Sequence, residues 1–245
     1  MTLLERLLGK AGKGTVEPSS AHDPNPHRSA VVRQAAAILL GYPDDALLTM
    51  LPAVRAALVE VEAAGPEFDE LAEWLTARSL DDVQADYVQE FDLSRRHSLH
   101  LTYWTDGDTR RRGEALSAFK EVYRSHGADF DETELPDYLP LVLEFAVRVS
   151  PEDGFELLQR YRPSLELLRL ALRDDHLPYL GVVSLVCSTL PGASPDDKQS
   201  VMAMAGYEPP TETVGLAPFD PRLLPVSEAG TAPRSVLATG GRNDQ

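Results

Sequence analysis

Cysteine and long apolar runs are both scarce in this chain. Cys187 is the one cysteine among 245 residues, which excludes an internal disulfide framework and fits a reducing compartment. No apolar run approaches the ~20 residues that a membrane-spanning helix needs, and the N-terminus lacks the charged-then-apolar order of a secretion signal. We therefore expect a cytoplasmic protein that does not insert into a membrane.

Basic side chains are also few. The chain has 23 lysine and arginine residues against 39 aspartate and glutamate residues, a formal net charge of -16. This balance argues against nucleic acid as a main partner, because phosphate binding needs a basic surface. A protein partner with basic segments would instead be attracted.

Catalytic motifs are missing as well. The sequence has no GxxxxGK[ST] phosphate loop, no GxGxxG, no HExxH and no GxSxG. Cys187 lies in the apolar run SLVCSTL, where a buried and inert thiol is expected. We therefore expect no enzyme and no bound cofactor. Two alternatives stay open: a nucleotide-binding module that uses the helix start at residues 107–110 as an anion site, and a helical scaffold in a permanent complex.

One histidine pair is a weak metal candidate. His97 and His100 are three residues apart, which on a helix would place both imidazoles on one face, with Asp92, Asp106 and Asp108 nearby in sequence. The pair lacks a fixed third ligand, so packing or hydrogen bonding at the edge of a groove is the favoured interpretation.

Apolar residues recur at helical spacing along most of the chain, and no Asn-Gly or Asp-Gly hairpin joins alternating strands. The sequence therefore predicts an all-α fold, a single helical-bundle domain of about nine to eleven helices. Predicted helices span residues 29–41, 45–64 with a break at Pro52, 67–77, 79–91, 109–126, 136–149, 150–174, 178–190 and 194–206, and Ser29, Ser79 and Ser150 are candidate caps. Pro163 divides the stretch from 150 to 174 into two helices or one kinked helix. Residues 92–108 are predicted as a loop.

The two ends of the chain differ from the middle. Residues 1–28 are expected to be a flexible segment, residues 29–206 the helical domain, and residues 207–245, rich in proline and glycine, a disordered tail. A helix at residues 3–8 fits the pattern but is short for independent stability.

Basic and acidic residues are concentrated in separate segments in the middle of the chain. Residues 94–127 hold seven basic and four acidic residues, whereas residues 129–156 hold nine acidic residues and one arginine. Solvated helix faces would explain both runs equally well. An acidic rim around apolar residues would also suit a basic amphipathic peptide, with charge steering the encounter and buried contacts supplying affinity.

The sequence predicts an apolar groove for such a peptide between the helices that start near Asp108 and Pro136. Leu116, Leu139 and Leu143 are predicted to line this groove, with Tyr103 or Trp104 at its edge. Asp137 and Glu144 are predicted to pair with basic residues of the peptide. Aromatic side chains are expected at the edge because they dominate peptide hot spots.

Five consecutive blocks carry a family resemblance. They are YVQEFD (residues 87–92), SLHLTY (98–103), GDTRRRGEAL (107–116), FKEVY (119–123) and ELPDYLPLVLEF (134–145). In this order they resemble the signature of the NarJ-type nitrate reductase delta-subunit chaperones, in the wider group of redox-enzyme maturation chaperones that includes the TorD and DmsD types. The resemblance covers roughly residues 30–205.

The resemblance implies an all-helical cytoplasmic chaperone that is not part of the mature enzyme. It would bind the N-terminal segment of the apo catalytic (alpha) subunit of respiratory nitrate reductase and keep that subunit competent for molybdenum cofactor insertion before membrane docking. Cofactor-delivery proteins are further candidate partners. The TorD and DmsD types carry a histidine after the aspartate of the last block, where this chain has Tyr138 after Asp137, which favours the nitrate reductase branch.

The physical argument and the resemblance together give one set of candidate peptide-binding residues. They are Asp92, Leu101, Tyr103, Trp104, Arg110, Leu116, Glu134, Pro136, Asp137, Tyr138, Leu139, Pro140, Leu143 and Glu144.

Overall fold

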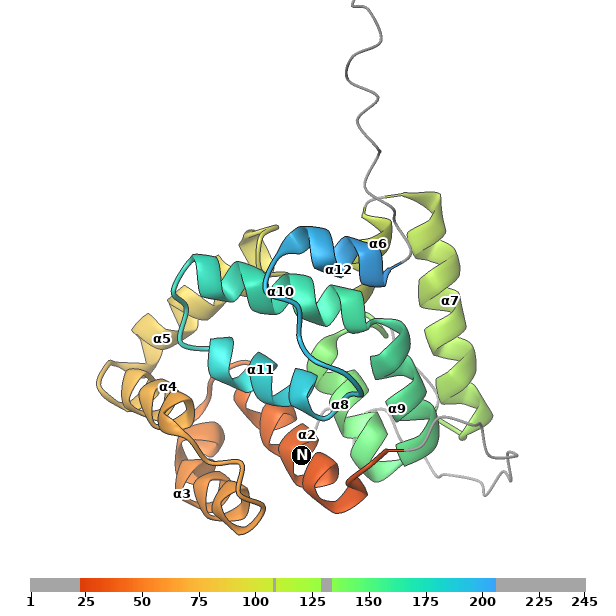
Figure 1. Ribbon diagram of the computed structural model, residues 1–245. Helices are drawn as coiled ribbons and strands as arrows, with labels where there is room; N and C mark the ends of the chain where they lie inside the picture. Colours follow the sequence, from red (N-terminus) through yellow and green to blue (C-terminus); the bar gives the residue numbers. More distant parts are fainter. Residues whose placement is uncertain (1–22, 108, 129–133, 206–245) are drawn as a thin grey trace, which may run out of the picture. The chain divides into compact units, whose positions relative to one another are not determined.

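The computed structural model describes residues 23–107, 109–128 and 134–205, and these contain eleven α-helices, one π-helical segment and no strand (Figure 1). The helices are α2 (Pro26–Leu39), α3 (Asp45–Glu60), α4 (Pro66–Thr76), α5 (Leu80–Tyr87), α6 (Leu101–Asp106), α7 (Arg110–Ser125), α8 (Leu139–Arg148), α9 (Pro151–Arg160), α10 (Arg162–Asp174), α11 (Leu180–Ser188) and α12 (Lys198–Met204), and the π-helix is η1 (Val88–Leu93). The all-α prediction is confirmed. The predicted short helix at residues 3–8 and the predicted tail from residue 207 lie outside the described residues.

Capping side chains mark several predicted helix starts. Ser79 accepts a hydrogen bond from the backbone N–H of Asp82, and Ser150 accepts one from Asp153 at the start of α9. The division at Pro163 is also confirmed, because α9 ends at Arg160 and α10 begins at Arg162 with the proline in its first turn.

Several helix predictions need correction. Asn25 rather than Ser29 caps α2, and the helix predicted from Pro136 begins only at Leu139 because residues 136–138 form a turn and the bridge to His100. Pro52 lies inside α3 without ending it, because the buried stripe Leu47, Leu51, Val54 and Leu58 holds the helix against its neighbours on both sides of the proline. Residues 88–93 continue from α5 as the π-helix η1, and the predicted loop at 92–108 contains α6.

The last correction concerns α12, which starts at Lys198 with an Asp197 cap rather than at Ser194. The preceding loop is tied to α10 instead. Arg162 Nη2 donates to the carbonyls of Gly192 (2.9 Å) and Ala193 (3.1 Å), and Ser194 Oγ donates to Glu166 Oε1 (2.7 Å). Because Glu166 is fully buried, this contact fixes the loop in a non-helical path.

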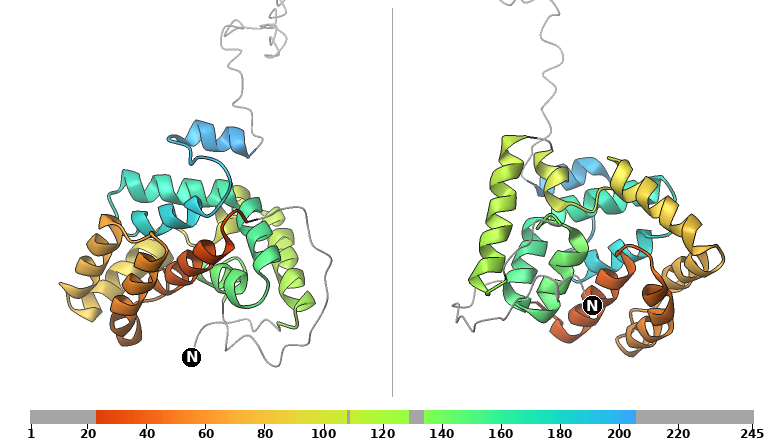
Figure 2. Two further views of the ribbon diagram at one scale, coloured as in Figure 1. Left: turned by 60° about the horizontal axis from the view of Figure 1, so that its bottom comes forward. Right: turned by 180° about the vertical axis from the view of Figure 1, so that it is seen from behind.

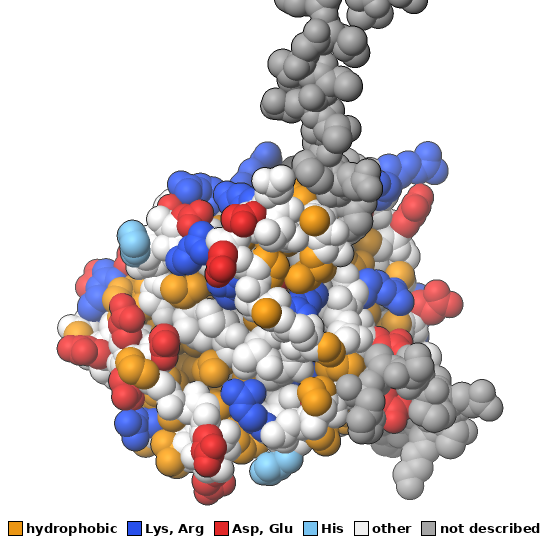
Figure 3. Space-filling view, viewed as in Figure 1, with side chains coloured by type: hydrophobic (Ala, Val, Ile, Leu, Met, Phe, Trp, Pro, Cys, Tyr) orange, Lys and Arg blue, Asp and Glu red, His pale blue; other side chains and the backbone are white. Residues whose placement is uncertain are grey.

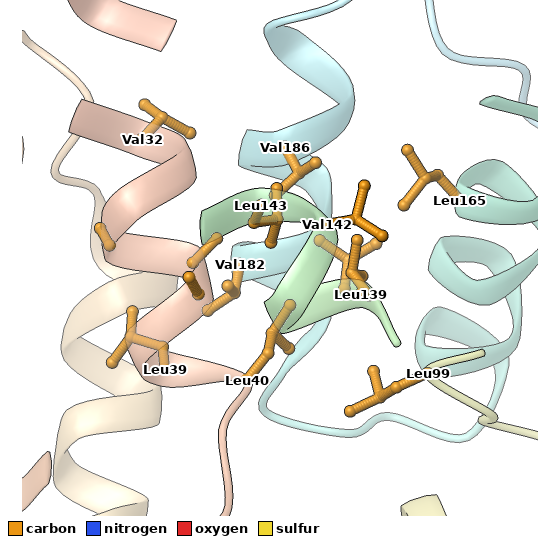
Figure 4. Packing of buried hydrophobic residues seen from close by; sticks show 14 of the residues in the cluster. Val32, Leu39, Leu40, Leu99, Leu139, Val142, Leu143, Leu165, Val182 and Val186 are labelled. Atoms are coloured by element: carbon orange, nitrogen blue, oxygen red, sulfur yellow. The ribbon is translucent and has the colours of Figure 1, made fainter. Parts of the chain in front are cut away.

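Helix α8 lies in the middle of the core. Residues 139–146 of this helix are all buried, and it packs against α2 on one side and α9 on another. Figure 4 shows side chains of α8, α11 and the C-cap of α2, among them Leu143, Val182 and Leu40, meeting in the same apolar cluster.

A glycine lets α8 and α9 approach closely. A Cβ atom at Gly154 would lie 2.3 Å from the Cα of Ala146. No side chain fits in that distance, so the spacing of these two helices depends on the glycine.

Candidate functional site

Two of the sequence blocks meet in space. Residues around His100 pair with residues around Tyr138 in an isolated antiparallel bridge. The N–H of Leu101 donates to the carbonyl of Asp137 (3.1 Å), and the N–H of Leu139 donates to the carbonyl of Leu99 (2.9 Å). The starts of α6 and α8 are thereby held side by side.

The carboxylate of Asp137 is fully buried at this junction. Its Oδ2 accepts hydrogen bonds from the backbone N–H (3.0 Å) and the hydroxyl (2.6 Å) of Thr102, and its Oδ1 lies 3.2 Å from Nδ1 of His100. Arg112 Nε in turn donates to the Thr102 hydroxyl at 3.2 Å. Burial alone would raise the pKa of Asp137, but His100 and Thr102 outweigh it and hold the pKa below its usual value.

Buried tyrosines extend this network. The Tyr87 hydroxyl donates to the carbonyl of Leu40 (2.7 Å) and lies 2.9 Å from the Tyr138 hydroxyl, and the Tyr123 hydroxyl donates to the carbonyl of Pro136 (2.8 Å). Burial raises the pKa of all three phenols, so they stay neutral donors. The network joins α2, α5, α7 and the start of α8.

Half of the predicted peptide-binding residues are buried. The buried set is Leu101, Pro136, Asp137, Leu139, Pro140, Leu143 and Glu144. Leu139 and Leu143, which were predicted to line a groove, face the core in this conformation and stabilise the fold. Contact between these residues and a peptide stays a prediction that would require the helices to separate.

The other predicted residues reach the surface. Asp92 and Arg110 are exposed, and Tyr103, Trp104, Leu116, Glu134 and Tyr138 are partly exposed. Tyr103 and Trp104 belong to α6 rather than to a loop, and Trp104 Nε1 donates to the carbonyl of Ser98 (2.9 Å). The guanidinium of Arg112 lies 5.9 Å from the centre of the Tyr103 ring. Arg112 thus connects the Tyr103 ring with Thr102 of the buried Asp137 junction.

The zinc alternative for the histidine pair is not supported. His97 is buried, with Nε2 2.8 Å from Asp175 Oδ2 and Nδ1 3.0 Å from Glu90 Oε2, whereas His100 lies beside Asp137. Among the described residues no group of three or more His, Cys, Asp or Glu side chains is placed to hold a metal ion. The nucleotide alternative involves Asp108, which lies outside the described residues.

An apolar groove does exist, at a place that the sequence did not predict. It is a cavity of about 380 Å³ between α2 and α3, closed at one side by Val147 of α8. Figure 2 (left) shows these three helices next to one another. Its lining residues are Ala30, Val31, Gln34, Ala35, Ile38, Met50, Ala53, Val54, Ala57 and Val147. Gln34 is the one polar residue in this lining, and it accepts a hydrogen bond from Arg148 Nε (3.2 Å).

The sequence held a signal for this groove. Helix α3 has one apolar stripe that is buried, and Met50, Ala53 and Ala57 form a second stripe beside it at helical spacing. Ala53 is exposed and Met50 is 39% exposed. Small apolar residues beside a buried stripe indicate a helix that is covered on one face and open on the next.

Acidic side chains gather over α3 and α4. Figure 3 shows them over α3 and α4 on the face seen in Figure 1. The exposed members of this group are Glu60, Glu62, Glu67, Asp69, Glu70 and Glu73. Arg55 of α3 pairs with Asp69 at 2.8 Å, but both side chains are more than half exposed, so the pair contributes little to stability. The surface of α3 and α4 therefore favours a ligand with basic residues.

Comparison with known proteins assigns the middle of the chain. Residues 60–184 match the family model described as nitrate reductase delta subunit. The nitrate reductase-like protein NarX of Mycobacterium tuberculosis is 42% identical over 162 residues, which cover 65% of this chain and 24% of NarX. The nitrate reductase molybdenum cofactor assembly chaperone NarJ of Escherichia coli is 33% identical over 124 residues, 51% of this chain and 52% of NarJ. The chain thus spans about a quarter of NarX and about half of NarJ.

The range that the family model matches contains the Asp137 junction but not most of the groove between α2 and α3. It includes the whole Asp137 junction, whereas Ala30 to Ala57, which supply nearly all of the groove lining, precede it. No helix in the described part of the chain is long and apolar enough to cross a membrane.

Proposed function

Because the chain belongs to the nitrate reductase delta subunit family, we propose that it is an assembly chaperone for a nitrate reductase. It binds the N-terminal segment of the apo catalytic subunit and keeps that subunit competent for molybdenum cofactor insertion before membrane docking. The similarity to NarJ of Escherichia coli, a nitrate reductase molybdenum cofactor assembly chaperone, supports the chaperone part of this proposal.

The proposed peptide binding rests on the open groove between α2 and α3. A cavity of about 380 Å³ with one polar lining residue is the kind of site into which an amphipathic helix places its apolar face. Water gains few hydrogen bonds there, so displacement of that water by leucine or phenylalanine side chains favours binding.

Charge gives the second part of the recognition. Exposed acids cover α3 and α4, with Glu60 and Glu62 following the groove lining at the end of α3, and the whole chain carries a net charge of -16. A segment with basic residues on its polar face would be steered to this surface, while its apolar face supplies affinity. The partly exposed Tyr103 and Trp104, on α6, are proposed as a second contact for the catalytic subunit.

A chaperone and a permanent scaffold differ in which form of the partner they bind. We would purify the tagged chain from cells that can or cannot synthesise molybdenum cofactor and identify the catalytic subunit by mass spectrometry. The proposal predicts more catalytic subunit on the chain when cofactor synthesis is blocked. Equal recovery with the mature, cofactor-loaded enzyme would show a scaffold, and absence of the catalytic subunit under both conditions would overturn the proposal.

A further inference from the structure

We propose that the groove between α2 and α3 is occupied by residues 3–8 of the same chain until the partner's segment displaces them. This inference rests on the proposed function for the identity of the competing ligand, but the docking itself does not depend on it. The argument uses the size of the groove, the pattern of the segment, its reach and its charge.

The groove accepts about two turns of helix. On α3 the lining runs over the eight residues from Met50 to Ala57, which corresponds to about 10 Å along the helix axis. Ala30 and Ile38 on α2 bound the opposite wall over a similar length. A longer helix would extend beyond the apolar lining.

The segment TLLERLLG at residues 2–9 matches that length and chemistry. Leu3, Leu4, Leu7 and Leu8 follow the i, i+1, i+4, i+5 spacing of one helix face, and Glu5 and Arg6 fall on the other. Six residues are too few for a helix that is stable in water by itself. Burial of four leucines in an apolar groove would supply the missing free energy.

The segment can reach the groove. The chain is anchored at Asp23, whose carboxylate pairs with Arg33 on α2 at 2.9 Å and accepts a hydrogen bond from Ser29 Oγ at 3.0 Å. Ala30, the first lining residue of α2, is one turn beyond the helix start. Residues 9–22 separate the segment from the anchor, and a flexible linker of this length spans roughly 20 Å on average.

Charge favours the same placement. The first 13 residues contain Arg6, Lys10 and Lys13 but one acid, Glu5, in a chain that is otherwise strongly acidic. The exposed Glu60 and Glu62 follow the groove lining at the end of α3. A segment with net positive charge beside these carboxylates is attracted rather than repelled.

Tethering makes the segment a competitor. A short flexible linker gives an effective concentration on the order of millimolar, so even weak docking keeps the groove occupied. A partner segment must then displace it, which reduces the measured affinity to the intrinsic affinity multiplied by the fraction of chains whose groove is free. The docked residues 3–8 would exclude weak, nonspecific apolar ligands from the groove, whereas the partner's N-terminal segment would bind tightly enough to displace them.

The test uses Met50 as a reporter in the full chain. The protein has four methionines, and Met50 is the one that lines the groove, so labelling with methyl-¹³C methionine gives a simple spectrum in which a Met50→Leu variant assigns the signal. We expect Leu4→Asp/Leu7→Asp to shift the Met50 methyl signal, because the docked leucines leave. The control Thr2→Asp/Gly9→Asp adds the same charge off the leucine face and should leave the signal in place.

An unchanged Met50 signal in Leu4→Asp/Leu7→Asp overturns the proposal. A shift that depends on protein concentration also overturns it, because the occupant would then be a second copy of the chain. In calorimetry with the partner's N-terminal peptide, Leu4→Asp/Leu7→Asp should bind roughly three- to tenfold more tightly than the unmodified chain. A Met50 shift without any peptide binding would support the docking and contradict the proposed function.

Discussion

Nδ1 of His100 lies 3.2 Å from Oδ1 of Asp137, a carboxylate that has no exposed surface. The two residues are 37 positions apart and come from different sequence blocks. The fold brings His100, the N-cap residue of α6, to this aspartate.

The buried carboxylate leads to the first prediction. Asp137→Asn removes the charge that Thr102 and His100 stabilise, so we expect a loss of about 1–3 kcal/mol in the free energy of unfolding at neutral pH. Chemical denaturation monitored by circular dichroism measures it. The control Asp69→Asn removes an exposed partner of Arg55 and should change stability little, and an equal effect of both variants would contradict the account.

The pH dependence of the same pair is the second prediction. The pKa of Asp137 is lowered in the folded state, so its contribution is fully present above the unfolded pKa of about 3.9 and is lost as the pH falls through the folded pKa. The difference in stability between the unmodified chain and Asp137→Asn should therefore shrink in acid. A difference that stays constant from neutral pH to below pH 3 would show that the charge of Asp137 is not the stabilising feature.

Glycine positions give the third prediction. Gly154→Ala should destabilise the protein by about 1–3 kcal/mol, because the new Cβ would lie 2.3 Å from the backbone of Ala146 and α8 and α9 must move apart. Gly113→Ala in α7 is the matched control, since a Cβ there meets nothing within 4 Å. Alanine favours helix at that position, so this variant should gain about 0.5–1 kcal/mol. Thermal unfolding of both variants gives the comparison, and a stable Gly154→Ala variant would contradict the packing.

Cys187 supplies the fourth prediction. Burial raises the pKa of its thiol far above the usual value, and the side chain has no exposed surface. A thiol reagent should label it only when the core opens, so the labelling rate should rise with denaturant in parallel with unfolding. Rapid labelling of the native protein would show that α11 opens independently of the rest.

The sequence predicted most helices because their signals are local. The caps at Ser79 and Ser150 and the proline at position 163 act within one turn, so they could be read without the fold. Pro52 was misjudged because burial of Leu51 and Val54 outweighs a local rule. The start of α12 was misjudged because Arg162 and Glu166, some thirty residues earlier, hold the loop before it.

The site was predicted less well for a related physical reason. The blocks from Tyr87 to Phe145 are dense in aromatic and charged residues, but the structure uses many of them in the network around Asp137. Periodicity shows that Leu139 and Leu143 share a helix with apolar surroundings, and it cannot distinguish a groove from a core. The open groove is lined by alanine and valine residues of α2 and α3, whose signal is weak in sequence.

The central claim is that the groove between α2 and α3 binds the N-terminal segment of the catalytic subunit. The most direct test is calorimetric titration of that peptide into Ala53→Glu, which places a carboxylate in the apolar lining, and into Ala56→Glu, which adds the same charge on an exposed position outside it. Circular dichroism would first establish that both variants are folded. We predict that Ala53→Glu weakens binding at least about tenfold, roughly 1.4 kcal/mol, while Ala56→Glu binds as the unmodified chain does. Equal affinity of the two variants would contradict the account.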